Sequence, residues 1–444
     1  MPAALVSVAA LLLGAGILLL GNGLQSILLP VRATIEAFST SSIGLIGAAY
    51  PAGFVVSCLT TPRIVRRVGH IRTFAVLAAI AAAIVLLLVL LVHPVSWVLL
   101  RIGSGFCFAG LFMVIESWLN EASTNSNRGQ IFSTYMVVNL LTLTAGQMML
   151  PLADPADFTL FAIAAMLITL GLVPVGLTTS AGPHRIERVR LRWGRLYRMS
   201  PVGVLGCAFV GLANSAFGTF GPVFAGEIGL SLTGIALFMS AALIGGALAQ
   251  LPLGRLSDRM DRRKVVVLAC VLAVGLAVVL ALIGDAHEGG RLFGLDDIGL
   301  VELAPAILIG LIALFGASIY PIYSLCVAHT NDYVASEDFV EASSGLLLTW
   351  GIGAAIGPNL AAAVMEGVGL AGLFAYTASI HLLFCAFTIW RMTRRSPVPM
   401  AERESFVAGS TGPVKATPVS AALDPRAPDQ PDDQPSNERA AAAA

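Results

Sequence analysis

Long apolar stretches repeat along the chain, and they constrain its fold more than any other feature. Each is about 20 residues long, the length of helix that crosses the hydrocarbon core of a bilayer. Of the 444 residues, 57% are hydrophobic and only 12% are charged, whereas a soluble domain has about a quarter of its residues charged. We therefore predict an all-α integral membrane protein. The twelve expected transmembrane helices lie near 5–29, 42–60, 73–92, 96–118, 130–152, 158–179, 201–225, 233–253, 265–284, 299–325, 340–364 and 370–391.

The basic residues between these stretches predict how the chain is oriented. Residues 181–200 carry six arginines against one glutamate, and the loops at 61–72 and 254–264 are also basic. The alternate loops carry only two arginines between them. Basic loops stay on the cytoplasmic side of a membrane. The loop expected at 326–339 is acidic, and acidic residues count little in this rule. We therefore expect both termini in the cytoplasm.

The two halves of the chain also repeat each other. The loop at 62–69 can be aligned with the loop at 254–261, and both follow the second helix of a six-helix set. Two parallel repeats are the arrangement of many secondary transporters, in which the substrate site lies at the midplane between them. The predicted organisation is a first six-helix bundle at 1–180, a basic cytoplasmic linker at 181–200, a second bundle at 201–392 and a disordered cytoplasmic tail at 393–444.

Several motifs resemble those of the major facilitator superfamily (MFS). The loop Gly254-Arg-Leu-Ser-Asp258-Arg259-Met-Asp261-Arg262 resembles the family's loop motif, although Asp261 stands where glycine is usual. Arg101-Ile-Gly-Ser-Gly105 resembles an R-x-x-x-G element, and Gly353-x-x-x-Gly357-Pro358 stands on the eleventh span. The resemblance implies the MFS fold. It also implies a gating role for Gly254, Asp258, Arg259 and Arg262, and a part in proton coupling for Arg101.

A second group of residues is similar to a narrower branch of poorly characterised bacterial permeases. It comprises Glu116-Ser-Trp118-Leu-Asn120, Arg128-Gly129, Tyr320-Pro321 and His329-Thr-Asn331-Asp332. The resemblance implies a multi-pass protein of the bacterial inner membrane, without naming a substrate.

Glu116 and Arg101 are the two ionisable residues that we single out within the spans. Charged groups inside a membrane are costly and default to a functional hypothesis, so we expect Glu116 to take part in proton coupling. Its alternative role is a structural pairing with Arg128 at the cytoplasmic interface. Arg101 lies 15 residues earlier on the same helix, which is about 22 Å, so the two cannot pair directly. Arg101 could bind an anion or extend to the membrane surface.

Neutral polar residues within the spans form a candidate substrate site. In lipid, such groups either bond neighbouring helices together or line a wet cavity. Taken together, they fall on helices that line the central cavity of the resembled family, and we expect some to contact substrate. The candidates are Asn22, Gln25, Tyr135, Asn139, Asn214, Tyr320 and Tyr323.

Other classes of function find little support in the sequence. The formal net charge is zero, which argues against nucleic-acid binding, and the chain has no G-x-x-x-x-G-K-[ST] loop for ATP and no H-E-x-x-H or G-x-S-x-G. We expect no enzymatic activity, cofactor or metal site. We predict a monomeric secondary transporter that moves a small solute by alternating access and is coupled to protons. The alternatives are an uncoupled facilitator, a membrane sensor on a transporter scaffold and an intramembrane enzyme.

Overall fold

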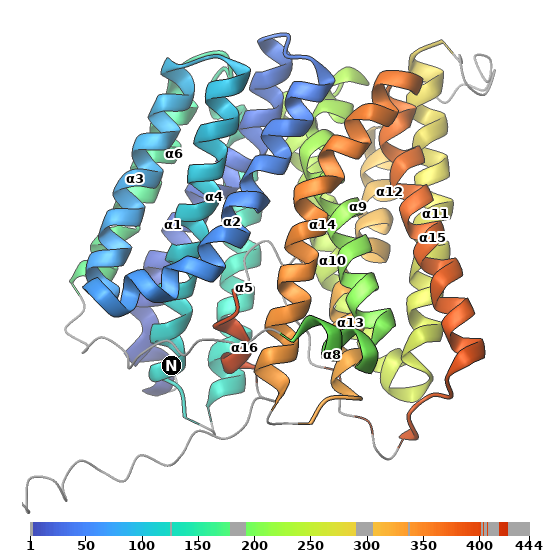
Figure 1. Ribbon diagram of the computed structural model, residues 1–444. Helices are drawn as coiled ribbons and strands as arrows, with labels where there is room; N and C mark the ends of the chain where they lie inside the picture. The colour runs from blue at the N-terminus through green and yellow to red at the C-terminus, as the bar shows by residue number, and fades with distance from the viewer. Residues whose placement is uncertain are drawn as a thin grey trace, which may run out of the picture.

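The fold is a bundle of membrane-spanning helices in two halves that lie side by side (Figure 1). The computed structural model describes residues 3–124, 127–177, 192–289, 305–335, 338–400, 403, 406 and 417–424. Within these residues, twelve helical spans are long and apolar enough to cross a membrane, as the sequence predicts. The all-α membrane fold is therefore confirmed.

The first half contains six spans. They are α1 (Ala3–Ile35), α2 (Thr40–Val68), α3 (His70–Leu90), α4 (Pro94–Glu121), α5 (Arg128–Gln147) with the short 3₁₀ helix η1 (Leu150–Leu152), and α6 (Thr159–Leu170) with α7 (Leu172–Gly176).

The second half follows a short linking helix, α8 (Trp193–Met199). Its spans are α9 (Pro201–Glu227), α10 (Leu232–Arg259), α11 (Arg262–His287), α12 (Pro305–Ile319) with α13 (Pro321–Asn331), α14 (Phe339–Val368) and α15 (Ala371–Arg394). A last short helix, α16 (Ser420–Leu423), belongs to the C-terminal tail.

Local sequence explains where several helices begin and break. Ser39 and Ser231 accept hydrogen bonds from the backbone of the first turns of α2 and α10, as N-cap residues do. Pro321 has no N–H to donate, and the tenth span breaks at Tyr320 into α12 and α13. The span then continues to Asn331, so the acidic loop expected at 326–339 is shorter than predicted. Thr330 lies in this extension, and its hydroxyl donates to the Cys326 carbonyl at 2.9 Å within the helix.

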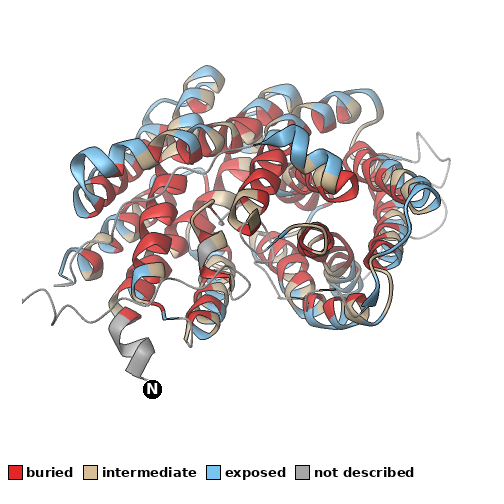
Figure 2. Ribbon diagram, turned by 60° about the horizontal axis from the view of Figure 1, so that its bottom comes forward, coloured by how far each residue is buried: buried red, intermediate tan, exposed pale blue. Residues whose placement is uncertain are grey.

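Apolar side chains cover the outside of the bundle as well as its core. Leu90, Leu177 and Leu248 are more than two-thirds exposed. Figure 2 shows the buried surfaces of the helices turned toward one another and the exposed surfaces turned outward. An outer surface of this kind is suited to lipid, because there apolar side chains lose nothing by exposure.

The bundle has two ends, at which the helices are joined by loops. The N-terminal face, at the bottom of Figure 1, is where α1 begins and α8 and α16 lie. At the opposite face the two halves pack closely: the backbone N–H of Ser41 donates to Glu366 Oε1 at 3.1 Å. Nearby, a Cβ at Gly44 would come within 2.9 Å of the Pro358 carbonyl oxygen. The halves therefore touch through α2 and α14 on this side.

The described residues include part of the predicted linker and part of the predicted tail. Of the basic linker at 181–200, residues 181–191 lie outside the described residues, while Trp193–Met199 is helical. The tail was expected to be disordered from 393, but α15 continues to Arg394 and residues 417–424 pack against the bundle. At these positions neighbouring helices supply buried partners, which the composition of the tail does not reveal.

Candidate functional site

A cavity of about 210 Å³ lies between the two halves. Both halves contribute to it, as expected for a site between two repeats. Its polar and aromatic lining residues are Asn22, Ser26, Tyr50, Phe54, Arg101, Asn139, Gln147, Asn214, Ser215, Thr219, Tyr320 and Trp350. Polar groups therefore converge from several helices on one largely apolar space, which is the usual composition of a small-molecule site.

Arg101 is the one charged side chain among the described residues that line the cavity. Its guanidinium carbon lies 4.5 Å from the centre of the Tyr50 ring, a cation–π distance. Its Nε has no hydrogen-bond partner among the described residues. The arrangement leaves an uncompensated positive charge next to the cavity.

A glycine explains how Arg101 comes to lie over Tyr50. Gly105 follows Arg101 by one helical turn on α4, and a Cβ there would overlap the Tyr50 carbonyl oxygen. Gly53 on α2 makes the reciprocal contact with the Ile102 carbonyl. Small residues let membrane helices approach closely. The glycine of the R-x-x-x-G element thus brings α4 against α2 and places the arginine at the cavity.

Four of the polar residues predicted from the sequence meet at this cavity: Asn22, Asn139, Asn214 and Tyr320. Both polar side-chain atoms of Asn139 and of Asn214 are buried and have no hydrogen-bond partner among the described residues. Buried amides without partners are costly. A bound polar solute would supply the missing hydrogen bonds.

The other three predicted substrate residues lie elsewhere. Gln25 is fully buried, and its Oε1 accepts from Ser104 on α4 at 3.5 Å, so it joins two helices within the first half. Tyr323 packs against the hydrophobic core of the second half. Tyr135 donates to Glu116 Oε1 at 3.3 Å. None of the three is among the residues that line the cavity.

Several cavity residues were missed by the sequence analysis. Tyr50 was hidden in the apolar run of α2, where only the Tyr-Pro pair marked it. Trp350 was not among the predicted candidates, but it lines the cavity. Gln147, the last residue of α5, accepts from Ser240 Oγ at 3.3 Å and so connects the halves.

Glu116 is fully buried on α4, between the cavity and the N-terminal face. Its carboxylate accepts hydrogen bonds from Tyr135 on α5 and from the Thr417 hydroxyl of the tail. Tyr135 precedes the cavity residue Asn139 by one helical turn. The acid is therefore within two side chains of the cavity. Among the described residues its side-chain partners are hydroxyl groups, not Arg128 of the alternative structural reading.

The predicted gating residues gather at the N-terminal face of the second half. The Arg262 guanidinium is 1% exposed, and its Nε donates to Asp332 Oδ2 at 2.8 Å. Its Nη1 lies 3.2 Å from Asp258 Oδ1. Arg259 is exposed. A Cβ at Gly254 would overlap the ring of Phe406, so this glycine makes room for the tail.

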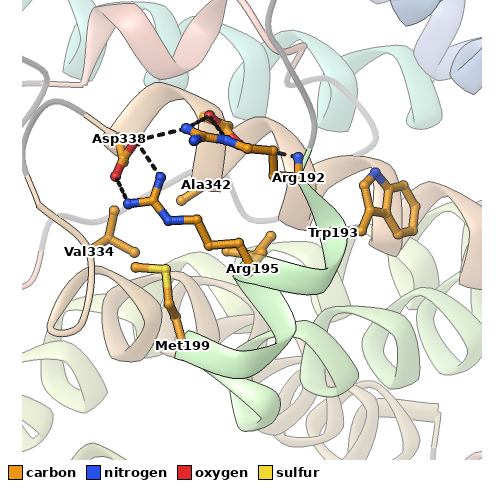
Figure 3. Close-up of a pocket in the computed structure, with 10 residues that line it drawn as sticks. Arg192, Trp193, Arg195, Met199, Val334, Asp338 and Ala342 are labelled. Carbon is orange, nitrogen blue, oxygen red and sulfur yellow. Dashed lines mark hydrogen bonds and ion pairs between the residues drawn. The ribbon is translucent and has the colours of Figure 1, made fainter.

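A second group of ion pairs fastens the linking helix to the second half. Figure 3 shows Arg192 and Arg195 pointing at Asp338, just before α14. Arg195 Nη2 lies 2.6 Å from Asp338 Oδ2, and Arg192 Nη2 lies 2.7 Å from Glu341 Oε2. Both arginines are about half exposed, so each pair contributes little free energy.

Comparison with known proteins identifies relatives across nearly the whole chain. The family model described as Major Facilitator Superfamily matches residues 11–295 and 203–427. The uncharacterized MFS-type transporter Ent638_1421 of Enterobacter sp. strain 638 is 26% identical over 394 residues, covering 88% of this chain and 97% of the relative. The uncharacterized MFS-type transporter YcaD of Escherichia fergusonii is 26% identical over 399 residues, with the same coverage.

Solved structures share the architecture at low sequence identity. The nucleoside transporter NupG superposes with a TM-score of 0.71 at 13% identity, covering 88% of this chain and all of NupG. A bacterial homolog of the human lysosomal transporter Spinster gives a TM-score of 0.65 at 14% identity, covering 92% of this chain and all of that protein. These similarities show the fold alone. With the family match over most of its length, the chain belongs to the major facilitator superfamily.

Proposed function

We propose that the protein is a proton-coupled secondary transporter of the bacterial inner membrane that moves a small amphiphilic organic anion by alternating access. The central cavity is the observation that carries this proposal, because both halves line it and it holds Arg101, which has no carboxylate partner among the described residues. The N-terminal face, which bears the basic loops, would lie in the cytoplasm.

The substrate class follows from the cavity lining. Arg101 would bind a carboxylate or another anionic group, and Asn139 and Asn214 would bond polar substituents. Tyr50 and Trp350 offer flat apolar surfaces for the rest of the solute. A neutral analogue of the same shape would leave Arg101 without a counter-charge and would therefore bind less tightly.

A thermal-stability screen of the purified protein tests this substrate class. Aromatic carboxylates are compared with their matched amides, since a ligand raises the unfolding temperature according to its affinity for the folded state. We expect the acids to stabilise the protein more than the amides, and the Arg101→Met variant to lose that preference. Equal stabilisation by both series would contradict the anionic substrate.

Proton coupling is assigned to Glu116. Burial disfavours the charged form of a carboxylate, and a change in hydration as the cavity alternates between sides would favour proton release. The Glu116→Gln variant keeps the shape but cannot titrate. We expect it to lose accumulation of the solute in proteoliposomes under a pH gradient, while binding survives. The exposed Glu121 on the same helix provides the control Glu121→Gln, which should transport as the parent does.

Two outcomes would change this assignment. If Glu116→Gln still concentrates the solute as the parent does, the coupling residue lies elsewhere. If the parent only equilibrates the solute, the protein is an uncoupled facilitator. The orientation is tested separately: a reporter active only in the periplasm, fused after Arg395, should be silent.

A further inference from the structure

A short segment of the C-terminal tail is buried between the two halves at the N-terminal face. Its helix α16 contacts α4 and α5 of the first half and α14 of the second (Figure 1). Leu423 is fully buried and belongs to the main hydrophobic core, and Val419 packs against that core. Thr417 is 1% exposed. A segment held by two apolar side chains and a buried hydroxyl is seated in a site rather than lying on the surface.

The polar contact at this site is made by Glu116. The Thr417 hydroxyl donates to Glu116 Oε2, while Tyr135 donates to the other carboxylate oxygen at 3.3 Å. The Thr417 hydroxyl also accepts from the Val419 backbone N–H at 3.3 Å, and Ser420 Oγ donates to the Thr417 carbonyl at 2.7 Å. These bonds shape the segment around the acid.

The same tail is also attached to the second half. The backbone N–H of Phe406 donates to both Asp258 oxygens, at 3.0 and 3.2 Å, and its ring packs on Gly254. Arg403 Nη1 donates to the Met260 carbonyl at 2.7 Å. The tail therefore contacts the gating loop of one half and the buried acid of the other.

The position of the segment determines what it would do. The halves pack directly at the opposite face, through α2 and α14. At the N-terminal face, residues 417–424 contact both halves beside the buried Glu116. Any solute leaving the cavity past Tyr135 and Glu116 would meet this segment.

We propose that the pocket formed by α4, α5 and α14 around Glu116 is a binding site for residues 417–424 of the same chain, and that their binding closes the N-terminal face of the cavity. Transport then requires the segment to leave the pocket. Closure of the cavity by this segment depends neither on the identity of the substrate nor on coupling of transport to protons.

Limited proteolysis of the full-length purified protein tests whether the segment is bound through Thr417. Lys415 and Arg426 are trypsin sites that flank the segment in the sequence, and Arg439 lies beyond it as an internal control. The Thr417→Val variant keeps the shape but removes the hydroxyl donor, whereas Thr417→Ser retains it. When release is fast relative to cleavage, the cleavage rate follows the released population.

We expect Thr417→Val to raise cleavage at Lys415 and Arg426 by about tenfold, because the buried Glu116 carboxyl loses a hydrogen-bond partner. Cleavage at Arg439 should be unchanged, and Thr417→Ser should resemble the parent. Equal cleavage of the parent, the Val variant and the Ser variant at all three sites would overturn the proposal.

Labelling of a cavity cysteine tests whether the segment closes the cavity. Met136 lines the cavity, about two turns into α5 from the N-terminal face. The six native cysteines are buried, and the parent without the new cysteine gives the background. In a full-length Met136→Cys protein, we expect Thr417→Asp to speed labelling by a bulky maleimide about tenfold or more, since the new carboxylate would face Glu116. If Thr417→Asp left the labelling rate of Met136→Cys unchanged although proteolysis became faster, the segment would be bound without closing the cavity. That result would overturn the proposal that the segment closes the N-terminal face.

Discussion

The loop between α2 and α3 and the loop between α10 and α11 occupy equivalent places in the two halves, but their arginines have different surroundings. In the first loop Arg63, Arg66 and Arg67 are exposed. In the second, the Arg262 and Arg263 side chains are 1% and 3% exposed and are paired with carboxylates.

The acids account for this difference. Asp258 and Asp261 stand where the first half has Arg66 and Gly69. An arginine is rarely buried fully unless a carboxylate compensates its charge. Positive charge alone is sufficient to orient a loop on the cytoplasmic side, whereas a buried charge cluster also needs acids. We therefore propose a structural and gating role for the second loop and an orienting role for the first.

The largest expected effect is that of removing Arg262. The Arg262→Ala variant deprives Asp332, whose side chain is 3% exposed, of its guanidinium partner. Breaking a buried ion pair costs about 3–5 kcal/mol. The matched change in the first loop, Arg66→Ala, should cost less than about 0.5 kcal/mol because the side chain is exposed. Unfolding in mixed micelles by a denaturing detergent measures both, and equal losses would refute the contrast between the loops.

A smaller effect is expected at Gly254. In Gly254→Ala the new methyl group would overlap the Phe406 ring, and overpacking of this kind costs about 1–3 kcal/mol. The Phe406→Ala change removes the overlap. The double variant should therefore be no less stable than Phe406→Ala alone, a non-additivity that a double-mutant cycle measures. Pro62→Ala in the first loop serves as the control and should show no coupling to Phe406. Additive losses would mean that the ring does not pack on Gly254.

The Asp258→Asn variant tests the gate itself. Asp258 accepts from Arg262 and from the Phe406 backbone, and its side chain is 35% exposed. Losing its charge should weaken these contacts by about 1 kcal/mol. We expect the population to shift toward the state open at the N-terminal face, seen as faster labelling of Met136→Cys from that side. Unchanged accessibility at both faces would leave the second loop with an orienting role only.

The parts of this molecule that depend on local sequence were the ones that could be predicted. Twelve spans follow from apolar length, and the MFS assignment follows from motifs such as Arg101-x-x-x-Gly105. The site was predicted less well. Gln25 and Asn22 share one face of α1, but Gln25 is bonded to Ser104 and Asn22 lines the cavity. Spacing along a helix does not indicate which neighbouring helix each residue contacts.

The tail could not be predicted for a different reason. Its residues beyond 393 have little apolar surface of their own, which is typical of disorder. The partners that hold Thr417 and Phe406 are Glu116 and Asp258, which are distant in sequence and belong to different halves. Only the assembled bundle brings an acid and an apolar pocket to one place.

The smallest expected effect concerns Asp261, whose counterpart in the first loop is Gly69. Asp261 accepts from Arg263 Nη2 at 2.7 Å and from the Arg263 backbone N–H at 3.0 Å. Burial raises the pKa of the Asp261 carboxyl, but the hydrogen bonds and charge of Arg263 outweigh it, and the pKa lies below its ordinary value of 3.8.

A carboxyl whose pKa is lower in the folded state stabilises the fold above its ordinary pKa, and this contribution is lost as the pH falls through the folded-state value. The parent should therefore lose slightly more stability than Asp261→Asn when the pH falls from 6 to about 3. The difference should stay below about 1 kcal/mol, because burial of the Asp261 carboxyl opposes the effect of Arg263 on its pKa. Detergent-induced unfolding at several pH values measures it. The control Arg67→Ala, in the loop without acids, should keep the pH dependence of stability that the parent shows. If Arg67→Ala weakened the pH dependence as Asp261→Asn does, Asp261 would not be the source of that dependence.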